Sequence, residues 1–101
     1  MGASIQFANA TVEAKALRKN AGRWLQGLRK EAGLSQIQLA ERLGLKYYTF
    51  VSQVENGFGR VPSETMESWA RALGVPPADF ARRLLSFYDP ALHRLLFEDH
   101  Q

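Results

Sequence analysis

The sequence predicts an all-α fold built around a single core. Apolar residues recur at helical spacing along most of the 101 residues, and few runs alternate apolar with polar residues as strands do. Glycines and proline pairs separate the apolar segments, at points where one helix would end and the next begin. A chain of this length is long enough for one modest core and too short for two domains.

The first predicted helix contains a clear apolar stripe. We expect it to start at Thr11, which can act as an N-cap, or closer to Lys19, because Gly22 and Gly27 lower helix propensity. Gly33 is well placed as its C-terminal stop. The apolar positions follow one another at steps of four, three, one, three and four residues, as on the stripe of an amphipathic helix, and are Leu17, Ala21, Trp24, Leu25, Leu28 and Ala32.

Two short helices joined by a tight turn are predicted next. Ser35 is a good N-cap for a helix that runs to Leu43 and stops at Gly44. A further helix is expected over about residues 47–56, with Gly57 as its stop. The residues expected to face the core are Ile37, Leu39, Ala40, Leu43, Val51 and Val54.

Three more helices are predicted in the second half of the chain. The first covers about residues 64–73, with Ser63 as its cap and Gly74 as its stop. The second begins at the pair Pro76-Pro77, because proline is tolerated in a first turn. The last starts at the pair Asp89-Pro90, a cap followed by a proline at the first helical position.

Composition narrows the class of function. The net charge of +3 is uneven: residues 1–60 hold nine basic and four acidic residues, a net +5, whereas residues 61–101 hold four and six, a net −2. A basic first half favours a polyanionic partner. There is no cysteine, and His93 and His100 lack a third ligand at metal spacing, so we expect neither a metal site nor a cofactor. No catalytic set of residues stands out, and an enzyme is not expected.

The same sequence indicates where the protein works. The N-terminus lacks the basic and apolar pattern of a signal peptide, and no apolar run approaches the length of a membrane span. The absence of cysteine fits a reducing compartment. We therefore expect a cytoplasmic protein with no membrane partner.

The most informative segment lies between residues 34 and 57. The run LSQIQLAERLG is followed by SQVENG, and MESWARALGV follows in turn. In this combination the residues closely resemble the phage-lambda-repressor-like, or Xre-type, helix-turn-helix family, and the matching run extends from about Arg29 to Phe80. One departure is an apparent extra residue between Gly44 and Glu55, which predicts a longer or differently shaped turn.

The resemblance implies a fold and a division into parts. The expected fold is a five-helix lambda-repressor-like DNA-binding domain over residues 11–85, whose helix-turn-helix is centred on residues 35–56. Residues 1–10 show no firm pattern and are expected to form a flexible N-terminal arm. Residues 86–101 are expected to form an additional C-terminal helical extension. In such a domain the second helix of the motif lies in the DNA major groove.

The resemblance also implies site residues. Arg29 and Glu55 would form a structural ion pair that positions the recognition helix. Phe50 would either fill the core or lie against the DNA backbone, and the core is the favoured place. The residues expected to contact bases are Tyr48, Thr49, Ser52 and Gln53. Those expected to contact phosphates are Gln36, Lys46, Tyr47, Asn56 and Arg60.

The C-terminal segment carries more apolar surface than a small domain needs, which favours a protein interface. The predicted function is a sequence-specific regulator of transcription, a repressor in preference to an activator, that binds an inverted-repeat operator in double-stranded DNA as a homodimer. The alternative is an antitoxin, or another protein-binding module, that masks a partner through this segment. The residues expected at the dimer interface are Leu84, Phe87, Tyr88, Leu92, Leu95 and Leu96.

Overall fold

The computed structural model describes the backbone of residues 2–98 and the side chains of residues 11–98. Within these residues the chain is helical, with six α-helices, one short 3₁₀ helix and no strand. No helix among them is long and apolar enough to cross a membrane. In chain order the elements are α1 (Gly2–Glu31), α2 (Gln36–Arg42), α3 (Thr49–Glu55), η1 (Ser63–Thr65), α4 (Met66–Leu73), α5 (Pro77–Tyr88) and α6 (Pro90–Phe97).

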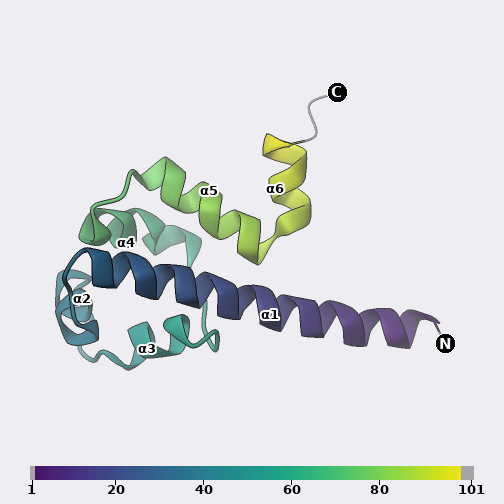
Figure 1. Ribbon diagram of the computed structural model, residues 1–101, viewed down its shortest axis with the longest axis horizontal. Helices are drawn as coiled ribbons and strands as arrows, with labels where there is room; N and C mark the ends of the chain where they lie inside the picture. Colours follow the sequence, from purple (N-terminus) through teal and green to yellow (C-terminus); the bar gives the residue numbers. More distant parts are fainter. Residues whose placement is uncertain (1, 99–101) are drawn as a thin grey trace.

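The long helix α1 organises the bundle. It runs between α5 and α3 in the view of Figure 1 and packs against both of them. The helix α2 packs against α3 and α4, and α4 also packs against α5. The last helix, α6, turns away from the bundle and packs mainly against α5 (Figure 1).

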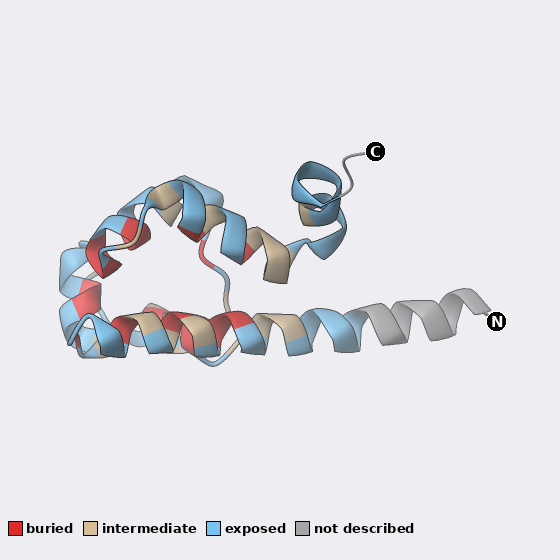
Figure 2. Cartoon of the chain, turned by 45° about the horizontal axis from the view of Figure 1, so that its top comes forward, coloured by how far each residue is buried: buried red, intermediate tan, exposed pale blue. Residues whose placement is uncertain are grey.

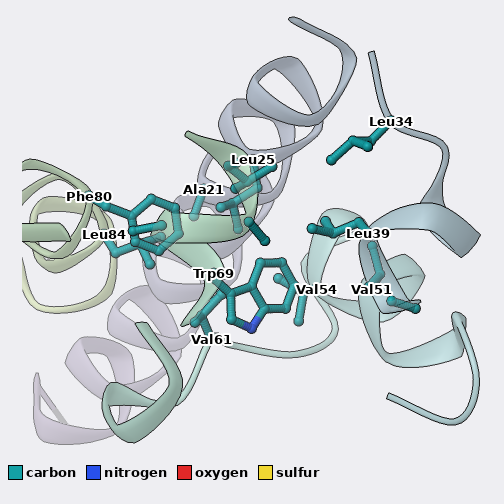
Figure 3. Packing of buried hydrophobic residues seen from close by; sticks show 14 residues of the cluster. Ala21, Leu25, Leu34, Leu39, Val51, Val54, Val61, Trp69, Phe80 and Leu84 are labelled. Atoms are coloured by element: carbon teal, nitrogen blue, oxygen red, sulfur yellow. The ribbon is translucent and has the colours of Figure 1, made fainter. Parts of the chain in front are cut away.

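The core lies where α1 to α5 converge. Trp69 is almost completely buried at its centre, surrounded by aliphatic side chains from the other helices (Figure 3). Trp24 extends the core toward α5, where its ring lies 5.5 Å from the ring of Phe80 and 6.1 Å from that of Phe87. Among the described residues the buried apolar side chains are Ala21, Leu25, Leu34, Leu39, Ala40, Val51, Val54, Val61, Trp69, Ala70, Ala72, Leu73, Phe80 and Leu84.

The first helix begins earlier than its apolar stripe predicts. The backbone is helical from Gly2, whereas the expected start was Thr11 or a residue closer to Lys19. The segment before Thr11 contains three alanines, and alanine is the best helix former, so the sequence is compatible with a continued helix there. The flexible arm expected for residues 1–10 falls where the side chains lie outside the described residues.

The boundaries of α2 follow local signals in the sequence. Ser35 forms a capping box with Gln38: its Oγ accepts a hydrogen bond from the Gln38 backbone N–H at 3.0 Å, and Ser35 N–H donates to Gln38 Oε1 at 2.8 Å. At the other end Gly44 adopts a φ of 70°, and the N–H of Leu45 donates to Ala40 O at 2.9 Å. This left-handed glycine cap turns the chain toward α3.

The expected inward position of Ile37 is wrong, because its side chain is 58% exposed. Leu39 and Ala40 are the buried residues of α2, and they set the face that packs on the core. Ile37 lies about 200° from Leu39 and about 60° from Ala40 around the helix. It therefore stands at the edge of the buried face rather than within it, and it is exposed to solvent.

The starts of α3 and α4 differ from the expected positions, whereas the start of α6 agrees with its expected position. Ser63 does not cap α4, because a 3₁₀ turn over Ser63–Thr65 precedes that helix and Thr65 occupies its N-cap position. The recognition helix is also shorter than the expected 47–56, since α3 covers Thr49–Glu55. The cap at the last helix is confirmed: Asp89 Oδ1 accepts a hydrogen bond from Leu92 N–H at 3.1 Å.

Candidate nucleic-acid interface

The helix α3 separates apolar from polar residues by face. Val51 and Val54 are buried against the core, whereas Thr49 and Gln53 are exposed and Ser52 is half-buried between them. This exposed side of α3, together with Tyr48 at its N-cap position, is called the recognition face below. Uncharged hydrogen-bonding groups on an exposed helix face suit contact with the edges of base pairs.

A buried ion pair fixes the C-terminal end of α3. Arg29 Nε lies 2.6 Å from Glu55 Oε2, and Arg29 Nη2 donates to Glu55 Oε1 at 3.0 Å. The two side chains are 9% and 2% exposed. The hydrogen bond and charge of Glu55 raise the pKa of Arg29 against the opposing effect of burial. This buried ion pair therefore links α1 to α3.

Two more hydrogen bonds extend this pair into a network. Arg29 Nη1 donates to the backbone carbonyl of Leu34 at 2.8 Å, and Gln36 Nε2 donates to Glu55 Oε1 at 3.1 Å. The network thus includes the α1–α2 loop and the first residue of α2. Gln36, which the resemblance assigns to phosphate contact, takes part in positioning α3 as well.

Gly22 is a structural residue whose role the sequence analysis missed. A Cβ at this position would collide with the backbone of Val54 and Glu55, so the absence of a side chain lets α1 and α3 cross closely. In the sequence Gly22 is only a residue that weakens a helix. Its partner lies more than thirty positions away, and no local pattern signals the crossing.

The turn between α2 and α3 carries three of the expected contact residues. Lys46, Tyr47 and Tyr48 are exposed, and the Lys46 ammonium lies 5.5 Å from the centre of the Tyr47 ring. Phe50, which follows the turn, packs on the core with its ring 6.3 Å from that of Trp69. The core position favoured for Phe50 is the one it occupies.

The two residues expected to hold phosphates after α3 lie in different surroundings. Asn56 is exposed at the end of α3, with its Nδ2 3.4 Å from Ser52 Oγ, beside the recognition face. Arg60 lies against α5, with its guanidinium carbon 4.5 Å from the centre of the Tyr88 ring. The structure therefore places Asn56 beside the recognition face and Arg60 against the Tyr88 ring.

Tyr88 is a half-buried residue that joins α5 to the loop after α3. Its hydroxyl accepts a hydrogen bond from Val61 N–H at 3.1 Å. Burial raises the pKa of the Tyr88 hydroxyl, although this hydrogen bond and the charges of Arg60 and Arg18 act in the opposite direction. Tyr88 thus makes contacts within its own subunit.

The residues expected at a dimer interface divide into two groups. Leu84 is fully buried in the core of its own subunit, so its expected interface position is wrong. Phe87 packs on Trp24. On α6, by contrast, no described residue is buried (Figure 2), and the helix carries exposed apolar side chains. The α6 surface, as the name is used below, consists of the three exposed leucines of this helix, Leu92, Leu95 and Leu96. Phe97 is also exposed, and its ring lies 4.5 Å from the guanidinium carbon of Arg82 in α5.

In the described part of the chain, no group of three or more His, Asp or Glu side chains is arranged to hold a metal ion. His93 pairs with Glu98, with Nδ1 and Oε2 2.8 Å apart, and His100 lies outside the described residues.

Comparison with known proteins connects this geometry to a family. No curated protein matches the chain. A family model of helix-turn-helix proteins matches residues 25–80, more than half of the chain. The matched range contains α2, α3, α4 and both members of the Arg29–Glu55 pair. The chain therefore belongs to the lambda-repressor-like, Xre-type helix-turn-helix family of DNA-binding regulators.

Proposed function

We propose that the protein is a sequence-specific repressor that binds an inverted-repeat operator in double-stranded DNA as a homodimer. The observation that carries this proposal is the position of α3. Its buried side is fixed by the Arg29–Glu55 pair and Gln36, whereas its other side offers polar groups to solvent. A helix held in this way matches the requirements of the major groove.

The recognition face supplies the base contacts in this proposal. Gln53 can bond both N6 and N7 of an adenine, and the methyl group of Thr49 can pack on that of a thymine. Ser52 is small enough to let the helix approach the bases closely. Tyr48, 47% exposed at the start of α3, reaches bases or the sugar beside them.

Phosphate contacts position the protein on the duplex. Lys46 and Tyr47 approach one strand from the turn, and Asn56 approaches the backbone from the end of α3. Gln36 uses one Nε2 hydrogen for Glu55, which leaves a second for phosphate. Arg60 binds with the edge of its guanidinium while the plane stays on Tyr88.

Dimerisation would give the protein its specificity, because one recognition helix reads only a few base pairs. Two subunits place their helices in successive major grooves about 34 Å apart. We assign the contact to the α6 surface, whose apolar side chains have no core to enter within the subunit. Repression follows as the simpler activity, since a dimer that occupies DNA blocks access without needing an effector domain.

A protein-masking role is the second candidate. The same α6 surface could cover a different protein, as in an antitoxin, while the helix-turn-helix retains its DNA function. A homodimer in purified protein that dissociates when a second protein binds α6 would favour this role.

Selection from random double-stranded oligonucleotides, followed by sequencing, tests the proposal. Enrichment of one inverted repeat with half-sites about one helical turn apart is the expected result. Sedimentation of the purified protein should give the mass of two subunits. A lack of enrichment with no binding to any duplex at low salt would contradict the proposal, as would a monomer at tens of micromolar.

A further inference from the structure

A basic groove lies beside the end of α3 and outside the recognition face. It has a volume of about 560 Å³ and runs between α1 and the loop that follows α3. Lys15, Arg18 and Lys19 line it from α1, and Asn56 and Phe58 line it from the loop. We call this feature the α1 groove.

The cations of the α1 groove have no acidic partner within the part of the chain whose side chains are described. Lys15 and Lys19 are exposed and form no ion pair with any residue whose side chain the structure describes. Arg18 is half-buried, and its Nε has neither solvent contact nor a hydrogen-bond partner among those residues. None of the described residues that line the groove is acidic. The shared chemistry of these groups favours an anionic ligand.

The shape of the α1 groove favours an extended anion over a small one. Lys15 and Lys19 stand one helical turn apart, about 6 Å between Cβ atoms, and so present a row of charges along α1. Phe58, opposite them, is 84% exposed and offers an apolar surface. A nucleic-acid strand carries both features, since phosphates alternate with sugars along it.

The α1 groove lies beside the recognition face, so DNA bound at that face would continue into the groove. Asn56 belongs to both the groove and the edge of the recognition face, so the two surfaces are continuous. Lys19 also lies against Gly57, where a Cβ would be 3.0 Å from the Lys19 Cα. This contact holds the basic side of α1 against the end of α3.

We propose that the α1 groove binds the phosphate backbone of DNA that flanks the half-site read by α3. The inference rests on the proposed function, and it extends the interface beyond the helix-turn-helix itself. Lys15, Arg18 and Lys19 precede residues 25–80, so this part of the contact is contributed by a segment outside the family match. Its effect is independent of base sequence, because only phosphates and sugars are touched.

Binding to duplexes of two lengths tests this inference. One duplex ends at the selected inverted repeat, and the other carries about ten further base pairs on each side, roughly one helical turn. The variants are Lys15→Gln and Lys19→Gln, singly and combined. Arg71→Gln is the matched control, because Arg71 is an exposed cation on α4 whose described partner is Glu67.

On the longer duplex, each lysine substitution should make the slope of log affinity against log salt shallower by about 1, and the combined variant by about 2. On the shorter duplex, the variants should bind like the unmodified protein. Arg71→Gln should leave both slopes unchanged. The double variant Lys15→Arg with Lys19→Arg should restore the full slope, because it keeps both charges.

The length comparison separates the failure of this inference from that of the proposed function. If the unmodified protein binds the short duplex but gains nothing on the long one, the α1 groove does not hold flanking DNA. Equal effects of the lysine substitutions on both lengths would also overturn the inference. If the unmodified protein binds neither duplex, the proposed function fails first and the inference fails with it.

Discussion

The helices α3 and α6 are nearly equal in length and opposite in construction. Seven residues form α3, and three of them, Val51, Val54 and Glu55, are buried. Eight residues form α6, and none is buried. The exposed side of α3 is polar, whereas the exposed side of α6 is apolar.

This difference matches what the proposed function requires of each helix. A helix that must place side chains accurately against base pairs needs a fixed backbone, and Arg29, Gln36 and Gly22 provide it through contacts with α1 and α2. A helix whose apolar side chains find no core in its own subunit is stabilised by burying them against another protein. Substitutions on the buried side of α3 should therefore lower the free energy of unfolding strongly, and substitutions on the α6 surface should change it little.

The largest expected effect comes from Glu55→Ala. The change leaves the Arg29 guanidinium buried without its carboxylate, and loss of one partner of a buried pair costs about 3–5 kcal/mol. Denaturant unfolding followed by circular dichroism measures this loss. Glu67→Ala is the control: it breaks the exposed Arg71–Glu67 pair, worth less than about 1 kcal/mol. Similar losses for the two variants would contradict the structural role of the buried pair.

A pair of glycine substitutions tests the α1–α3 crossing. Gly22→Ala should lower the free energy of unfolding by about 1–3 kcal/mol, because its Cβ would meet backbone atoms that cannot move aside. Gly27→Ala lies in the same helix with nothing within 4 Å of the added Cβ, and it should raise that free energy by about 0.5–1 kcal/mol. The same thermal or denaturant melts measure both, and a gain from Gly22→Ala would show that the helices are free to separate.

The smallest expected effect on unfolding comes from the α6 surface. Leu95→Ser, at a side chain 60% exposed, should change the free energy of unfolding of the monomer by less than about 0.5 kcal/mol. The same change should abolish dimerisation as measured by sedimentation. Val12→Ser on α1, where Val12 is 65% exposed, is the matched control and should leave the dimer intact. Unchanged association of the Leu95→Ser variant would place the interface elsewhere.

Local signals in the sequence predicted most helix boundaries. Ser35 and Asp89 cap the helices expected of them, and Gly44 and Gly57 end α2 and α3 with a left-handed backbone. These features depend on a few neighbouring residues and their hydrogen bonds. The start of α1 was missed because its alanine-rich beginning is helical without an apolar stripe to mark it.

The positions that sequence reasoning missed depend on contacts between distant segments. Ile37 and Leu84 are both apolar at helical spacing, yet one is exposed and the other is fully buried. The hydrogen bond from Gln36 to Glu55 and the close approach at Gly22 require the packed arrangement of α1, α2 and α3. The α1 groove, likewise, forms only when the middle of α1 meets the loop after α3.

The most direct test of the central claim, that the exposed face of α3 reads bases, is a selection from random duplexes with the unmodified protein and with Gln53→Ala. The variant should recover the same inverted repeat with the same spacing, but with relaxed preference at one symmetric pair of positions and a loss of about 1–3 kcal/mol on the original site. Unfolding of the two proteins should be indistinguishable, since Gln53 is exposed. A motif from the Gln53→Ala protein that is identical at every position, with unchanged affinity, would contradict the account.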